Sequence, residues 1–146
     1  MPILTSEQVT LVKEKAKAVR KNIIEAITSA NSGHPGGSLS IADLMTLLYY
    51  VEMNVDPQNP SWTERDRLVL SKGHGAPAWY AVLAEKGFFP KEELLGLRHI
   101  NRMLQGHPDM KGTPGVDMST GSLGQGISAA CGMALAGKID KKEYRV

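Results

Sequence analysis

A chain of 146 residues has the length of one ordinary domain, and its 42% apolar and 22% charged residues are typical of a folded, soluble protein. A net charge of +2 is too small to predict binding to nucleic acid or to a membrane surface. The single cysteine, Cys131, excludes an internal disulfide, and no apolar run reaches the roughly 20 residues of a membrane span, so we expect a cytoplasmic protein.

A long amphipathic helix is predicted at the amino-terminal end. Apolar residues at spacings of three and four run through residues 9–30 and share one helical face. Thr5 and Gln8 have the spacing of a capping box, in which each side chain can bond the other residue's backbone N–H. The polar and glycine residues at 31–33 end the pattern.

A second helix is predicted from residue 40 to about residue 51. Ser40 is the expected N-cap, and Asp43 lies in the first turn, where the helix dipole favours negative charge. An apolar stripe on this helix could serve a dimer interface, but core packing explains it equally well. The stripe consists of Met45, Leu48, Tyr49 and Met53.

A strand, a glycine loop and a helix are predicted next. The apolar run at 67–71 has the length of a strand, and an apolar helix follows at 77–86 with Gly87 at its end. Residues 144–146 resemble the start of another strand. This order predicts an α/β fold, a parallel sheet with helices on both faces. Because one complete strand would be poorly protected, we expect a truncated domain.

The remaining segments are two helices and a long loop. A short helix is expected at 91–99, and a small-residue helix at 124–136 with Gly137 as its cap. The glycine-rich and proline-rich loop at 106–121 is too long for a simple connection, which makes it a candidate for function.

Three of the four histidines are bracketed by glycine or proline: His34, His74 and His107. Any one of them alone is more often structural or merely exposed. Their shared loop context favours a common polar site, since imidazole can donate, accept or move protons near neutral pH. We interpret His99, within a helical pattern, as structural, and a zinc site is disfavoured because the histidines lack close-spaced partners.

The loop before the last helix has the composition of an anion site. Gly121, Ser122, Leu123 and Gly124 directly precede the helix, whose first N–H groups and dipole favour a phosphate. The spacing is neither that of a Walker loop nor that of the dinucleotide fingerprint. Close packing of the small-residue helix on the sheet is the alternative, and both interpretations can hold together.

Four motifs in order resemble the amino-terminal part of transketolases. They are Ser-Gly-His-Pro-Gly at 32–36, Ser-Lys-Gly-His at 71–74, Gly-His-Pro at 106–108 and Gly-Ser-Leu-Gly-Gln-Gly at 121–126. The resemblance extends over nearly the whole chain. It is strongest to the separate amino-terminal subunit of split transketolases, because full-length members usually carry proline in place of Ser122.

The resemblance implies the thiamine diphosphate-binding fold and a transferase activity of the pentose phosphate pathway. A two-carbon ketol unit would pass reversibly from a ketose phosphate to an aldose phosphate, with thiamine diphosphate and Mg²⁺ as cofactors. The expected partner is a pyrimidine-binding domain or carboxy-terminal subunit in a homo- or hetero-oligomer. The resemblance suggests neither nucleic acid nor membrane as a partner.

The resemblance also assigns roles to residues of this chain. His34 and His107 would contact the donor's hydroxyls and developing oxyanion, and His74 would border the reacting carbon, so these three are the candidate catalytic residues. Leu123 would pack on the pyrimidine ring of the cofactor. The candidate cofactor-binding residues are His74, Gly121, Ser122, Leu123 and Gly124.

Two features of the family are missing from residues 1–146. The Gly-Asp-Gly metal motif does not occur, and the glutamate that activates the aminopyrimidine belongs to the pyrimidine-binding domain. We therefore expect a partial diphosphate-binding domain that ends before the metal motif, holds no metal ligand, binds cofactor weakly and is inactive alone. Deoxyxylulose-phosphate synthase, dihydroxyacetone synthase and a non-catalytic fragment or regulatory partner remain alternatives.

Overall fold

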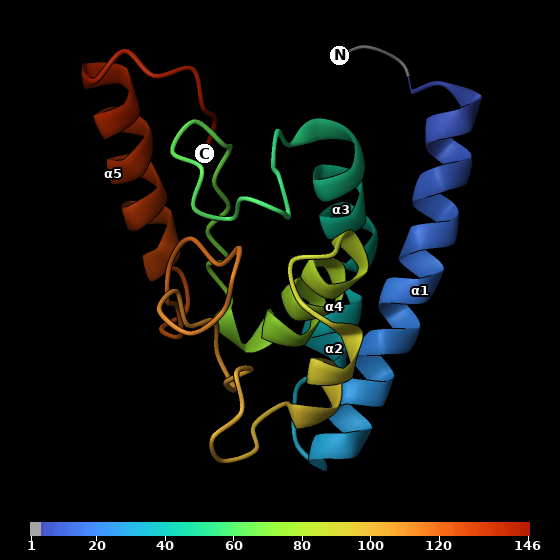
Figure 1. Cartoon of the computed structure of the whole chain (residues 1–146). Helices are drawn as coiled ribbons and strands as arrows, with labels where there is room; N and C mark the ends of the chain where they lie inside the picture. The colour runs from blue at the N-terminus through green and yellow to red at the C-terminus, as the bar shows by residue number, and fades with distance from the viewer. Residues whose placement is uncertain (1–3) are drawn as a thin grey trace.

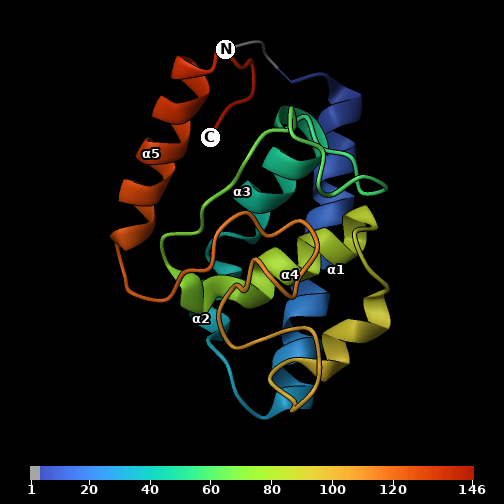
Figure 2. The same cartoon turned by 60° about the vertical axis from the view of Figure 1, so that its left-hand side comes forward.

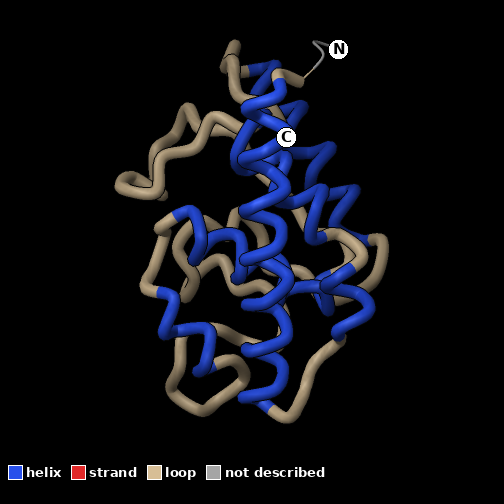
Figure 3. The backbone as a smooth tube through the Cα atoms, turned by 90° about the vertical axis from the view of Figure 1, so that its right-hand side faces the viewer, coloured by secondary structure: helices blue, strands red, loops and turns tan. Residues whose placement is uncertain are grey.

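The computed structural model describes residues 4–146 as helices joined by irregular segments, with no β-strand in that range (Figure 3). Three of the elements, η1, η2 and η3, are short π- or 3₁₀-helices. In chain order the elements are α1 (Ser6–Ala30), α2 (Pro35–Leu39), α3 (Ala42–Leu47), η1 (Leu48–Glu52), η2 (Gly73–Gly75), α4 (Ala76–Lys86), η3 (Lys91–Gly96) and α5 (Gln125–Ile139).

The long amino-terminal helix is confirmed as α1. The Thr5 hydroxyl accepts a hydrogen bond from the Gln8 N–H at 3.2 Å, and the Gln8 side chain accepts one from the Thr5 N–H at 2.9 Å. Asn31, at φ 47°, ends the helix in the left-handed conformation. Three residues at the centre of the predicted apolar face, Ala16, Val19 and Ile23, are buried, and Ala26, which was not predicted, is buried with them.

The second predicted helix, at 40–51, is divided into α3 and η1, a separate short helix α2 precedes it, and its predicted N-cap is wrong. The helical turn begins earlier, at Pro35, whose ring suits the first turn of a helix. Ile41 takes the N-cap position of α3. Ser40 is used otherwise, since its hydroxyl donates to the Gly37 carbonyl at 3.2 Å and accepts from Lys72 Nζ at 2.8 Å.

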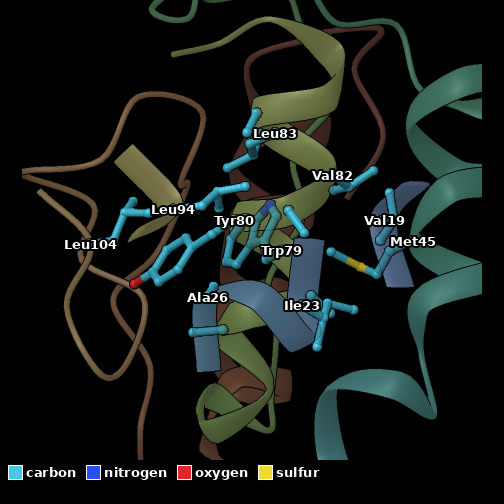
Figure 4. Packing of buried hydrophobic residues seen from close by; sticks show 14 of the residues in the cluster. Val19, Ile23, Ala26, Met45, Trp79, Tyr80, Val82, Leu83, Leu94 and Leu104 are labelled. Carbon is cyan, nitrogen blue, oxygen red and sulfur yellow. The ribbon is translucent and has the colours of Figure 1, made fainter. Parts of the chain in front are cut away.

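The core is centred on α4, which crosses between α1, α3 and η3 (Figures 1 and 4). The predicted end at Gly87 is confirmed, with φ 98°. From Ala76 to Ala84 the helix is buried on all sides, so each large apolar side chain in it contributes about 1.5–3 kcal/mol. Trp79 Nε1 donates to the Tyr49 hydroxyl at 2.6 Å, which satisfies both polar groups inside the core.

Core packing accounts for three of the four residues in the apolar stripe at 45–53. Met45 is 3% exposed and Tyr49 is 1% exposed, and both contact the central cluster. Met53 is partly buried and also packs against this cluster, and together with Leu48 it lines a pocket of about 500 Å³ between η1 and the carboxy-terminal segment.

The predicted parallel sheet is not confirmed in residues 4–146. The segment at 66–70 has no regular secondary structure, and a single backbone hydrogen bond, from the Arg67 N–H to the Arg145 carbonyl at 2.9 Å, joins it to the last residues. Two backbone N–H groups beside this bond donate to carboxylates instead: the Leu68 N–H donates to Asp117 at 2.8 Å, and the Arg145 N–H donates to Asp66 at 2.7 Å. Side-chain acceptors therefore replace part of a ladder.

Three smaller predictions are corrected. The helix predicted at 91–99 is the shorter η3, and His99 is exposed in the turn that follows it. Gly137 is not the cap of α5, because the helix continues to Ile139 and Asp140 ends it. Gly137 is buried under Tyr144 instead, where an added Cβ would lie 2.8 Å from the ring.

Helix α5 stands apart from the other helices in two views (Figures 1 and 2). Its only buried residues are Gly126 and Gly137, and the Cys131 thiol is free and exposed. Close packing of the small residues is thus limited to its two ends, where Gly126 lies against Ser71 and Gly137 lies against Tyr144, and packing on a sheet is not confirmed in residues 4–146. Among the described residues, no helix combines the length and apolar character needed to cross a membrane.

Candidate functional site

His34 and His74 lie side by side. His34 immediately precedes α2, His74 lies in η2, and their ring centroids are 5.2 Å apart with the planes at 61°. Gly37 makes this contact possible, because an added Cβ would lie 2.8 Å from Cδ2 and 2.9 Å from Nε2 of His74. Gly37 therefore provides the space that the His74 ring occupies.

His107 approaches the same region from the long loop. Its ring lies over Gly121, where an added Cβ would be 3.7 Å from Cδ2. The Tyr80 hydroxyl of α4 donates to the His107 carbonyl at 2.8 Å, which fixes the main chain. Burial lowers the pKa of His107, and the positive charges of Arg98, His34 and His74 lower it further. The neutral imidazole, which can accept a proton, is therefore favoured near pH 7.

The loop at 121–124 is joined to the segment that carries His74. Gly73 packs directly on this loop, since an added Cβ would lie 2.5 Å from the Thr120 carbonyl oxygen. The Thr120 hydroxyl donates to the Leu70 carbonyl at 2.7 Å, and the Gly124 N–H donates to the Ser71 carbonyl at 3.1 Å. The His107 ring and the segment that carries His74 therefore both adjoin the predicted glycine loop, and His34 joins this group through its contact with His74.

The start of α5 is open to a ligand. Gly124 is the N-cap at φ 82°, a left-handed conformation that favours glycine, and an added Cβ would meet no atom within 4 Å. A pocket of about 290 Å³ lies between residues 118–122 and the first turn of α5. The first N–H groups of a helix lack intrahelical partners and attract anions. Ser122 and Leu123 are exposed beside the pocket, Leu123 by 67%.

Sequence reasoning missed two cations that connect the histidine loops. Lys72 Nζ donates to the Gly37 carbonyl at 2.7 Å, and the Arg98 guanidinium donates to the Ser32 hydroxyl at 2.7 Å. Lys72 stands within a motif, between Ser71 and Gly73, which could have marked it. Arg98 lies outside every motif and carries no comparable signal.

The histidine cluster is not a metal site in this geometry. Within residues 4–146, no group of three or more His, Cys, Asp or Glu side chains is arranged to hold a metal ion. The arrangement offers imidazoles and bare backbone amides around an open loop, which suits an anionic ligand.

Residues 11–145 match the family model described as transketolase, thiamine diphosphate binding domain. A 6-deoxy-6-sulfo-D-fructose transketolase subunit of Clostridium sp. (strain MSTE9) is 55% identical over 135 residues, which are 92% of this chain and 49% of the relative. An apulose-4-phosphate transketolase subunit from Phocaeicola vulgatus is 41% identical over 94% of this chain and 49% of its own length.

A solved transketolase from Campylobacter jejuni has a similar structure, with a TM-score of 0.82 and 37% identity. The match covers 94% of this chain and 21% of that protein. The chain thus spans about half the length of the subunits that it matches, and a smaller part of a full-length transketolase.

Proposed function

We propose that this chain, which belongs to the transketolase family, supplies the diphosphate-binding side of an enzyme that transfers a two-carbon ketol unit between sugar phosphates. The observation that carries the proposal is the meeting of His34, His74 and His107 around the loop at 121–124. Histidines up to 73 positions apart in the sequence, from 34 to 107, would not gather at an open glycine loop for core packing alone.

The loop residues fit thiamine diphosphate. Gly121 and Gly124 leave room for close backbone approach, the start of α5 attracts the diphosphate, and His74 stands beside the loop as a hydrogen-bond donor. Ser122 can donate through its hydroxyl, and the exposed Leu123 can press on a ring. When bound, the cofactor supplies the reactive carbon and stores the electrons of the ketol unit.

The histidines would act on the sugar. His34, exposed beside His74, would hold a donor hydroxyl by hydrogen bonding. His107 is favoured in its neutral form, so its imidazole can accept a proton from the donor and return it later. Hydrogen-bond donors stabilise a transition state most when they already point at the atom that gains negative charge, because they need not reorganise during the reaction.

The other half of the site would come from a partner. Support comes from the two relatives named as subunits of transketolases and from the exposure of His34 and Leu123 to solvent. We propose a pyrimidine-binding subunit or domain as this partner, in a homo- or hetero-oligomer. Magnesium does not fit the described residues, which offer no group of three metal ligands, so no step here depends on it. Cytoplasmic location stays a prediction.

Titration calorimetry of the purified chain with thiamine diphosphate, and with thiamine, tests the cofactor site. We expect weak binding of the diphosphate and about tenfold weaker binding of thiamine, because thiamine lacks the anion. Gly121→Ala should weaken diphosphate binding about tenfold while the fold is kept, since its Cβ would meet only His107 at ordinary contact distance. Gly132→Ala, on the open face of α5, is the matched control. Equal affinity for both ligands would contradict the proposal.

Activity assays separate the alternatives. The chain mixed with the carboxy-terminal subunit of a split transketolase, thiamine diphosphate and magnesium should transfer a ketol unit to ribose 5-phosphate, and the chain alone should not. Turnover of pyruvate with glyceraldehyde 3-phosphate would instead indicate a deoxyxylulose-phosphate synthase. Ketol transfer by the chain without any partner would contradict the expectation that it is inactive alone.

A further inference from the structure

Arg98 connects the loop before His34 to the loop before His107. Its Nη1 donates to the Ser32 hydroxyl at 2.7 Å, two residues before His34. Its Nη2 reaches the Gly106 carbonyl, immediately before His107, at 3.5 Å. One planar guanidinium thus bridges segments that are far apart in the sequence.

The guanidinium is held firmly in this position. The Arg98 backbone has φ 61°, a left-handed conformation that is costly for a residue with a side chain, and its N–H donates to the Leu104 carbonyl at 2.8 Å. Nε is buried without a partner and lies over Gly106, where an added Cβ would be 3.1 Å away. A strained backbone and an unpaired buried donor are two costs that packing alone does not require.

We propose that Arg98 is a positioning residue of the histidine site, which holds the loop before His34 to the loop before His107 through its two hydrogen bonds and places its permanent positive charge beside His107. The proposal relies on the proposed function only in treating this cluster as the site. Arg98 is not assigned any contact with substrate or cofactor.

The charge effect follows from the groups around His107. Burial lowers its pKa most, and the Arg98 cation comes second, followed by His34 before α2 and His74 in η2. The Tyr80 hydroxyl from α4 donates to the His107 carbonyl. Burial raises the pKa of Tyr80, and the negative charge of Asp109, on the same loop as His107, raises it further. Arg98 is therefore the one group with a permanent positive charge among those that lower the pKa of His107.

The two roles can be separated by substitution. Arg98→Gln removes the positive charge. Arg98→Lys keeps the charge, but its single ammonium group cannot bond Ser32 and Gly106 at the same time. Ser32→Ala removes one hydrogen bond at an exposed position and leaves the charge in place. Arg102→Gln is the control, because Arg102 lies in the same turn and pairs with Glu93 at 3.4 Å instead.

The test uses proton NMR of the histidine rings in the 146-residue chain without cofactor. The four Cε1–H signals are assigned with single His→Gln variants, and each is titrated from pH 8 to 5. We expect the pKa of His107 to rise in Arg98→Gln, to remain low in Arg98→Lys and Ser32→Ala, and to be unchanged in Arg102→Gln. His99, exposed in the turn, should not respond in any variant.

Hydrogen exchange tests the positioning role. Exchange of the Ser38 amide, which bonds the His34 carbonyl at 3.1 Å, should become about tenfold faster in Ser32→Ala and in both Arg98 variants. The proposal fails if the pKa of His107 does not move in Arg98→Gln, or if Arg98→Lys exchanges like the wild type. If Arg98→Gln does not fold, exchange of the Ser38 amide in Ser32→Ala and Arg98→Lys still decides whether Arg98 positions the loop. Failure of cofactor binding in calorimetry would reject the proposed function and leave these results unaffected.

Discussion

Lys72 Nζ donates a hydrogen bond to the carbonyl oxygen of Gly37 at 2.7 Å, across 35 residues of sequence. A second bond, to the Ser40 hydroxyl at 2.8 Å, holds the same ammonium group. Since Gly37 lies directly against the His74 ring, Lys72 fixes the turn that carries His34 to the turn that carries His74.

Replacing Lys72 by methionine should loosen this connection. Methionine keeps the length of the side chain but cannot donate, so the chain loses two hydrogen bonds from a charged group. We expect the free energy of unfolding to fall by about 1.5–3 kcal/mol, measured by urea denaturation. Lys17→Met, at an exposed position of α1, should change it by less than about 0.5 kcal/mol. Equal losses in both variants would show that the two bonds contribute nothing measurable.

Gly37→Ala and Gly36→Ala form a matched pair for the space beside His74. A Cβ at position 37 would lie 2.8 Å from His74 Cδ2, whereas a Cβ at position 36 would meet no atom within 4 Å. We expect Gly37→Ala to displace the His74 ring, which shifts its Cε1–H NMR signal, and to weaken thiamine diphosphate binding about tenfold. Gly36→Ala should leave the signal in place. If both variants shift it equally, the ring does not depend on the space at Gly37.

Local signals in the sequence predicted α1 and α4 correctly. The capping box of Thr5 and Gln8 and the terminating Gly87 each act within a few residues, so spacing alone reveals them. Local spacing could not decide the strand expected at 67–71, because a β-strand forms only where its backbone pairs with another strand. The Leu68 N–H bonds Asp117, 49 residues away, and no local pattern encodes that choice.

The site was predicted in part. The glycine contexts marked His34, His74 and His107, and the resemblance to a family suggested that they converge. Composition and spacing could not place the His34 and His74 rings 5.2 Å apart. Arg98 escaped notice because its hydrogen bond to Ser32 spans 66 residues and depends on a left-handed backbone that arginine rarely adopts.

Gly73→Ala should destabilise the contact between η2 and the glycine loop. Its Cβ would lie 2.5 Å from the Thr120 carbonyl oxygen and 2.9 Å from the Gly121 nitrogen, and backbone atoms cannot move aside as a flexible side chain can. We expect a loss of about 1–3 kcal/mol in urea denaturation. Gly132→Ala in α5 has free space and should stabilise the chain by about 0.5–1 kcal/mol, because alanine favours a helix. If both variants changed the free energy of unfolding in the same direction, the packing argument would be contradicted.

Asp66 should make the free energy of unfolding depend on pH in the acid range. Burial acts to raise its pKa, but hydrogen bonds from the Asn54 N–H and from Arg145 outweigh this effect, so the pKa lies below its ordinary value of 3.8. A carboxylate with a lowered pKa stabilises the fold fully above 3.8, and this stabilisation is lost as the pH falls through the folded-state value. Asp66→Asn should therefore cost about 1.5–3 kcal/mol at pH 7. That cost should shrink as the pH falls below 3.8, as measured by urea denaturation across pH. Glu143→Gln, exposed nearby, should cost little at any pH, and a cost of Asp66→Asn that stays constant with pH would refute the charge argument.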